Sequence, residues 1–216
     1  MVWPFWREFG RKLIHLLSFF FVLIYWAVER FFGHATGLLA LVGLLVVLIE
    51  LEHIRLEWHP KIPFLSKLWK LFKRPKEQKA LGAEVFFLLG AIVCFAAFDR
   101  RVATAAVLMT TFGDFIAGLV MYVGRIPVYK YRKLEASIAE LLVDIGVGWL
   151  FLRTSAWWLQ GFTMTGNVLW IPVLLMAVTA TVVETTTHKI DDNLVVPIAA
   201  GLVGHIALLI LGIPLF

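Results

Sequence analysis

Long apolar runs, separated by short charged connections, constrain this chain more than any other feature. A helix rises 1.5 Å per residue, so about 20 apolar residues are needed to cross roughly 30 Å of hydrocarbon. Seven segments approach that length, and they cover residues 13–28, 31–49, 80–98, 102–124, 134–152, 168–183 and 194–216. The sequence therefore predicts an all-α, polytopic membrane protein with about seven transmembrane helices.

Composition points to the same medium, because 61% of the 216 residues are hydrophobic and only 16% are charged. A soluble chain of this length would have too little polar surface to cover so large an apolar interior. The one cysteine, Cys94, lies in an apolar run. The chain therefore has neither a disulfide framework nor a thiolate metal site.

Basic residues are divided unequally between alternate connections. The N-terminus and the connections on its side hold 16 of the 20 Lys and Arg residues, and the other side holds 4. Loops rich in positive charge stay cytoplasmic. We therefore expect a cytoplasmic N-terminus and an external C-terminus. Topology accounts for the net charge of +5, so nucleic acid is not an expected partner.

The chain is expected to form one transmembrane domain over residues 1–216. Residues 60–79 interleave apolar and basic side chains at helical spacing. Such a basic amphipathic segment is drawn to anionic headgroups by ~1 kcal/mol per basic residue. We expect it to lie on the cytoplasmic surface of the lipid bilayer. The sequence leaves the oligomeric state and the source membrane open.

Asp114 interrupts an otherwise apolar run, and it lies ten residues before Gly124. That spacing puts it about 15 Å along a helix, near the middle of the bilayer. A carboxylate at a helix centre costs ~2.5–3.5 kcal/mol on insertion scales, so it normally faces protein or water. We expect Asp114 to line a cavity that opens to the cytoplasm. The alternative is a structural aspartate hydrogen-bonded to neighbouring helices.

The segment at 134–152 carries further acids. Glu140 and Asp144 are four residues apart and share one helical face, whereas Glu135 points elsewhere. Cations in the loop before this segment are expected to lie above the same cavity, and they are Arg125, Lys130, Arg132 and Lys133. Carboxylates below and cations above match the needs of a magnesium-bound polyphosphate.

Polar residues also gather in the last cytoplasmic loop, which contains Glu184, His188, Asp191, Asp192 and Asn193. They could bind a cation or the polar edge of a nucleotide. Alternatively, Asp192 or Asn193 could simply cap the final helix. On the same side of the membrane, His15 follows Arg11 and Lys12 by one helical turn.

Six stretches occur in one order along nearly the whole chain: "FGRKLIHLL", "IELEHIRL", "LFKRPKEQKALGAEVFFLLG", "FGDFIAGLVMYVGR", "RKLEASIAE" and "DDNLVVPIAAGL". Together they resemble the family of CTP-dependent lipid-alcohol kinases, which includes dolichol, polyprenol and phytol kinases and the CTP-using diacylglycerol kinases. The family's three short motifs fall on Arg11, Lys12 and His15, on Gly113 and Asp114, and on Asp192 and Asn193. The family's Lys-Ser-Leu-Glu-Gly-Ser loop is altered here, with Arg132 for lysine, Lys133 for the first serine and Ala136 for glycine.

The resemblance implies transfer of the γ-phosphoryl group of CTP to the hydroxyl of a membrane-resident alcohol, with Mg²⁺ as cofactor and the active site facing the cytoplasm. Asp114 would hold magnesium or accept the alcohol proton, and Glu135 and Glu184 would be further metal ligands. The nucleotide and its phosphates would be bound by Arg11, Lys12, His15, Arg125, Lys130, Arg132, Lys133, Asp192 and Asn193.

Two other function classes remain open. A cytidylyltransferase that makes a CDP-lipid also uses CTP, but its usual glycine-rich, multi-aspartate signature is absent after His188. A transporter or channel could carry intramembrane acids along a path, but the segments become apolar toward the expected outer face. The sequence does not select the alcohol, and the altered loop leaves the choice between CTP and other nucleoside triphosphates open.

Overall fold

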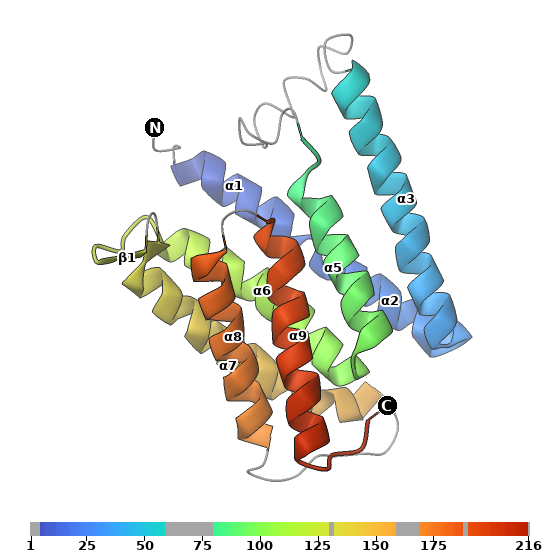
Figure 1. Ribbon diagram of the computed structural model, residues 1–216. Coiled ribbons are helices and arrows are strands. Elements are labelled where there is room, and N and C mark those ends of the chain that lie inside the picture. Colours follow the sequence, from blue (N-terminus) through green and yellow to red (C-terminus); the bar gives the residue numbers. More distant parts are fainter. Residues whose placement is uncertain (1–4, 59–79, 130–131, 159–168, 188–189, 216) are drawn as a thin grey trace. The chain divides into compact units, whose positions relative to one another are not determined.

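The structure is a computed structural model that describes residues 5–58, 80–129, 132–158, 169–187 and 190–215 (Figure 1). They form two compact units, Met1–Leu89 and Gly90–Phe216. The boundary falls inside helix α5 (Ala83–Ala97). The described residues are mostly helical, as expected. The amphipathic segment predicted at about 60–79 lies outside them, and the expectation of one transmembrane domain stays a prediction.

The first unit contains α1 (Phe5–Leu16), α2 (Phe19–Phe32) and α3 (His34–Trp58). Helices α2 and α3 pack against each other, and they meet at Gly33, whose φ of +87° suits a residue without a Cβ. Between α1 and α2 the backbone forms i→i+3 hydrogen bonds, and in one of them Ser18 N–H donates to the His15 carbonyl over 2.9 Å. The prediction of one helix over 13–28 is therefore wrong, because i→i+3 hydrogen bonds replace the helical pattern there.

A buried ion pair on α3 also contacts the chain at residues 80–82. Arg55 donates to both oxygens of Glu52, over 2.9 and 2.6 Å. Glu52 also accepts from Gly82 N–H over 2.7 Å, and Arg55 donates to the Ala80 carbonyl over 2.6 Å. These contacts give the "IELEHIRL" stretch a structural role, since they fix the start of the segment that leads into α5.

Within its described residues, the second unit contains the end of α5, four long helices and a hairpin. Their bounds are α6 (Arg100–Val120), β1 (Pro127–Tyr129), β2 (Arg132–Lys133), α7 (Leu134–Trp158), α8 (Trp170–Thr186) and α9 (Asp192–Ile210). Helix α6 packs against α7, α8 and α9, and α8 lies beside α9 (Figure 1). The final helix ends at Ile210, short of the predicted 216, and Gly212 then turns the chain with φ +65°.

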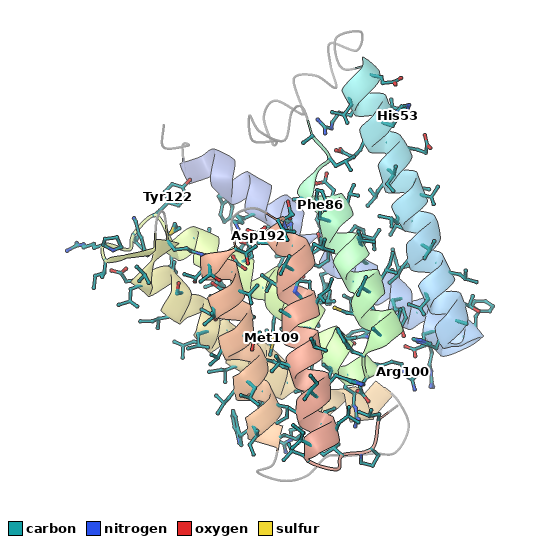
Figure 2. The ribbon with its side chains drawn as sticks, viewed as in Figure 1. His53, Phe86, Arg100, Met109, Tyr122 and Asp192 are labelled. Atoms are coloured by element: carbon teal, nitrogen blue, oxygen red, sulfur yellow. The ribbon has the colours of Figure 1, made fainter. Side chains whose placement is uncertain are left out.

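Small and medium apolar side chains fill the centre of this second unit. Alanines 105, 106, 177, 180 and 200 pack with larger residues such as Met109, which Figure 2 labels. Small residues let helix backbones approach closely when lipid cannot drive their association. Every residue of α6 from Arg101 to Thr111 is buried, so α6 is the central helix of the unit.

The outer faces of the helices are apolar. Exposed large side chains include Leu142 on α7, Leu174 and Val178 on α8, and Leu202 and Leu209 on α9. Among the helices that the structure describes, three are long and apolar enough to cross a membrane, namely α3, α6 and α9, and α5 and α8 are shorter apolar helices. Apolar faces outside and polar groups inside are typical of helices surrounded by lipid.

At the end of the second unit where α6 begins, polar contacts join α6 to the chain that follows α9. Asp99 caps α6 by accepting from Arg101 N–H over 2.9 Å. The Arg101 guanidinium pairs with Asp99 and donates to the Pro214 carbonyl over 2.5 Å. His205 Nδ1 accepts from Asp99 N–H over 3.0 Å. These contacts lie at the opposite end of α6 from Asp114.

Candidate functional site

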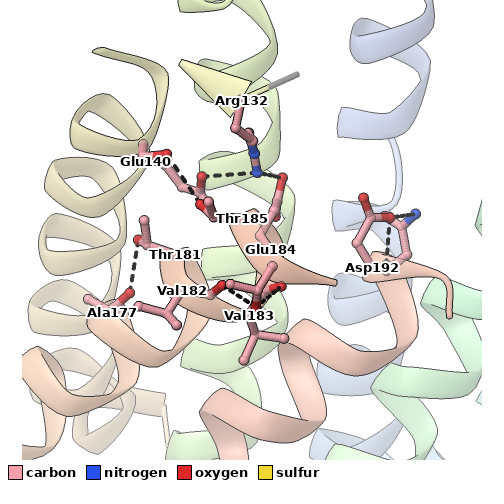
Figure 3. Close-up of polar contacts among 12 residues, drawn as sticks. Arg132, Glu140, Ala177, Thr181, Val182, Val183, Glu184, Thr185 and Asp192 are labelled. Atoms are coloured by element: carbon pink, nitrogen blue, oxygen red, sulfur yellow. Dashed lines mark hydrogen bonds and ion pairs between the residues drawn. The ribbon is translucent and has the colours of Figure 1, made fainter. Parts of the chain in front are cut away.

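The site is centred on Arg132, which comes from the β-hairpin and lies between α7 and α8 (Figure 3). Its Nη2 is 3.2 Å from Glu140 Oε2 and also contacts Glu184 Oε1. The side chains are 12%, 1% and 5% exposed for Arg132, Glu140 and Glu184. One guanidinium is therefore shared by two carboxylates inside a helical unit with apolar outer faces.

More acids surround this pair. Glu140, Asp114 and Asp192 all act electrostatically on Glu184, so the site draws side chains from α6, α7, α8 and the start of α9. Burial of the Arg132 guanidinium opposes its charge, but Glu184, Glu140 and Asp114 outweigh burial and raise the pKa of Arg132 above its usual value. Arg132 thus stays charged and partly neutralises the surrounding carboxylates.

Glu135 holds the base of the hairpin that carries Arg132. Its carboxylate accepts from the backbone N–H of Arg125 over 2.7 Å and of Ile126 over 3.2 Å. A Cβ at Gly124 would lie 3.0 Å from Glu135 Oε2, so glycine gives this carboxylate room. These hydrogen bonds tie the chain before β1 to the start of α7. This structural role was not predicted, and the expected role of Glu135 as a metal ligand stays a prediction.

The start of α9 places two further predicted residues. Asp191 caps the helix by accepting from Asn193 N–H over 3.1 Å. The side-chain amide of Asn193 donates to the Asp191 carboxylate over 2.8 Å and to the Asp192 carboxylate over 3.1 Å. The structure therefore has the polar turn that the alternative expected at this helix start, but the cap position is Asp191, which has the extended backbone of a cap, and not Asp192 or Asn193. Asp192 Oδ1 also accepts from Asn193 N–H, over 3.0 Å.

The other expected site residues are distributed as follows. Arg125 is exposed, and Lys133 and Asp114 are half-buried. Lys12 and His15 are buried on α1 in the first unit. Lys130 and His188 lie outside the described residues, and Arg11 is described only as part of the α1 backbone. Of the expected site residues, the structure thus brings together Asp114, Arg132, Glu184 and Asp192.

Sequence reasoning singled out Glu140 and Asp144 as a shared face but did not include them among the site residues. The structure shows Glu140 to be a direct partner of Arg132. Ser137 on α7 and Thr185 on α8 also connect these two helices, since their hydroxyl oxygens are 3.2 Å apart. The i, i+4 spacing of two acids in an apolar run was the available signal.

The donor chemistry fits a magnesium ion that arrives with phosphates. Within the described ranges, no group of three or more His, Cys, Asp or Glu side chains is arranged to hold a metal by itself. Magnesium is usually bound by one or two carboxylates together with substrate phosphates and water. Asp114 and Glu184 carry carboxylate oxygens of that kind on neighbouring helices and would suit such an ion.

Comparison of this chain with protein-family models, curated proteins and solved structures finds no match. The resemblance to the lipid-alcohol kinases therefore rests on the six sequence stretches alone.

Proposed function

We propose that this chain is a membrane lipid kinase that transfers the γ-phosphoryl group of CTP to the hydroxyl of a membrane-resident alcohol. Acceptors of the polyprenol or dolichol type are the first choice, and diacylglycerol and phytol follow. The observation that supports this most is the guanidinium of Arg132 held between Glu140 and Glu184, with Asp114 and Asp192 as charged neighbours. Such a set of acids and a cation is suited to phosphate and metal.

In this proposal the chain crosses the bilayer about seven times, with its N-terminus and active site on the cytoplasmic side. The hairpin and the start of α9 then lie at the cytoplasmic mouth, where a water-soluble nucleotide has access. The alcohol enters between helices while its tail stays in lipid. The apolar outer faces of α7, α8 and α9 support a bilayer around the second unit.

Phosphoryl transfer depends mainly on positioning and charge neutralisation. Arg132 and Lys133, with Arg125, Lys130, Arg11, Lys12 and His15, bind phosphate oxygens in this proposal. Asp192 and Asn193 bind the polar edge of the nucleotide. Asp114, Glu135 and Glu184 supply oxygens to Mg²⁺, which when bound neutralises charge on the polyphosphate.

The proposed reaction balances without any further reagent. A bond forms between the alcohol oxygen and the γ-phosphorus, and the bond from that phosphorus to the β–γ bridging oxygen breaks. CDP leaves with the electron pair of the broken bond, and the alcohol proton passes to a carboxylate. The products are a lipid monophosphate and CDP.

The test supplies purified full-length protein with Mg²⁺ and either γ-labelled or α-labelled CTP, against prenols and diacylglycerol. A kinase moves only the γ label into lipid, whereas a cytidylyltransferase moves the α label. Labelled ATP and UTP report nucleotide choice. Transfer of the α label, or of no label, would refute the proposal.

Asp114→Asn is the matching variant, since it removes the charge and keeps the shape. We expect turnover to be lost while the folded protein remains abundant. Glu50→Gln is the control because Glu50 is an exposed acid on α3. Near-normal turnover of Asp114→Asn would exclude Asp114 from the site.

A further inference from the structure

Asp144 is a buried carboxylate that the site described so far does not use. It lies on α7 one turn beyond Glu140 and is 1% exposed. Its Oδ1 has no hydrogen-bond partner among the residues that the structure describes. Burying an acceptor without a donor destabilises a fold. A carboxylate kept under these conditions is a candidate for binding a ligand that supplies the donor.

The position of Asp144 is defined by Gly113. A Cβ built on Gly113 would collide with Asp144 Oδ1, and it would lie 3.2 Å from Asp144 Cγ and 3.3 Å from Glu140 Cγ. The carboxyl group of Asp144 therefore occupies the space of the missing side chain. Because Gly113 precedes Asp114 directly, Asp144 lies at the level of Asp114 on the neighbouring helix.

The charges around Asp144 restrict what can bind there. Glu184, a like charge, acts on it most strongly, and Arg132 acts in the opposite sense. An anionic group in direct contact with Asp144 would be repelled by Asp144 itself and by Glu184. A metal held by protein alone is disfavoured, since the described residues contain no group of three or more ligand side chains arranged for one. A neutral hydroxyl donates one hydrogen bond and adds no charge.

We propose that Asp144 binds the hydroxyl of the acceptor alcohol and takes its proton, a role that rests on the proposed function. As the alcohol oxygen bonds to the γ-phosphorus, its proton moves to Asp144 Oδ1, and the bond to the bridging oxygen breaks to release CDP. In this assignment Asp114 contributes to binding the metal and the nucleotide and does not accept the alcohol proton. Burial of Asp144 also keeps bulk water, a competing acceptor, away from the reacting group.

The experiment compares wild type, Asp144→Asn, Asp144→Leu, Asp114→Asn and the control Glu50→Gln as full-length proteins in one detergent. Transfer of γ label to the alcohol, Tm without substrate, and the Tm shift caused by Mg²⁺ with CTP are measured. We expect Asp144→Asn to lower turnover at least about 100-fold, as loss of a general base does. Its Tm should equal or exceed that of wild type, and its shift with Mg²⁺ and CTP should be unchanged. Asp114→Asn should lose that shift.

Four outcomes would overturn the role. They are turnover of Asp144→Asn close to that of wild type, loss of its nucleotide shift, a lower Tm, and failure of both Asp144→Asn and Asp144→Leu to fold. The last two would make Asp144 a structural residue. If wild type transfers no γ label to any alcohol, the proposed function fails and this role fails with it. If wild type is active and Asp144→Asn is equally active, only the role of Asp144 fails.

Discussion

Replacing Gly113 by alanine tests the close packing of α6 against α7. In a helix interior alanine is favoured over glycine by about 1 kcal/mol. At Gly113 the added Cβ would collide with Asp144 Oδ1 and lie close to Glu140, and forcing an extra methyl into a packed interior costs about 1–3 kcal/mol. We therefore expect Gly113→Ala to range from neutral to about 2 kcal/mol destabilising.

Gly146→Ala is the matched control, because a Cβ at Gly146 on α7 would meet nothing within 4 Å. It should gain the full helix-propensity term of about 1 kcal/mol. The two alanine variants should therefore differ by about 1–3 kcal/mol. For a chain of this size that corresponds to about 2–12 °C in Tm. Thermal unfolding of both variants in one detergent at one scan rate measures the difference.

A double mutant identifies the colliding group. Asp144→Ala removes the carboxyl that occupies the space at Gly113, so Gly113→Ala should cost less in that background by about 1–3 kcal/mol. The reasoning is refuted if Gly113→Ala is as stable as Gly146→Ala. It is equally refuted if the effects of Gly113→Ala and Asp144→Ala simply add.

Two further perturbations test the buried ion pairs. Arg132→Met should destabilise the protein by about 3–5 kcal/mol, because it leaves Glu140 and Glu184 buried without their shared cation. The control is Arg153→Gln, which changes an exposed arginine and should alter Tm little. Similar Tm values for the two variants would contradict the role of the ion pair. Glu52→Ala should cost about 3–5 kcal/mol, because Arg55 and the Gly82 amide lose their acceptor. Its control is Glu57→Ala, which removes only an exposed i, i+4 contact with His53. An equal fall in Tm for both variants would show that the Glu52–Arg55 pair does not hold residues 80–82 in place.

The helical character of the chain and its apolar segments could be predicted from sequence, because both depend on local residue type and spacing. Segments 102–124 and 134–152 correspond to α6 and α7, and the charges inside them marked where polar contacts would lie. Local pattern was less informative at helix ends. The break between α1 and α2 depends on i→i+3 hydrogen bonds, which no periodicity in the apolar run at 13–28 indicates.

The sequence by itself determined that carboxylates and cations would have to be accommodated within an apolar helical protein. Only the tertiary structure decided which groups meet: Arg132 with Glu184, more than fifty positions later in the chain, and Gly113 with Asp144 on the next helix. The physical reason is that residue type fixes the cost of burying a charge, whereas the rotation and spacing of packed helices fix its partner. Those two quantities arise from contacts between distant segments, and the spacing of residues along one helix does not encode them.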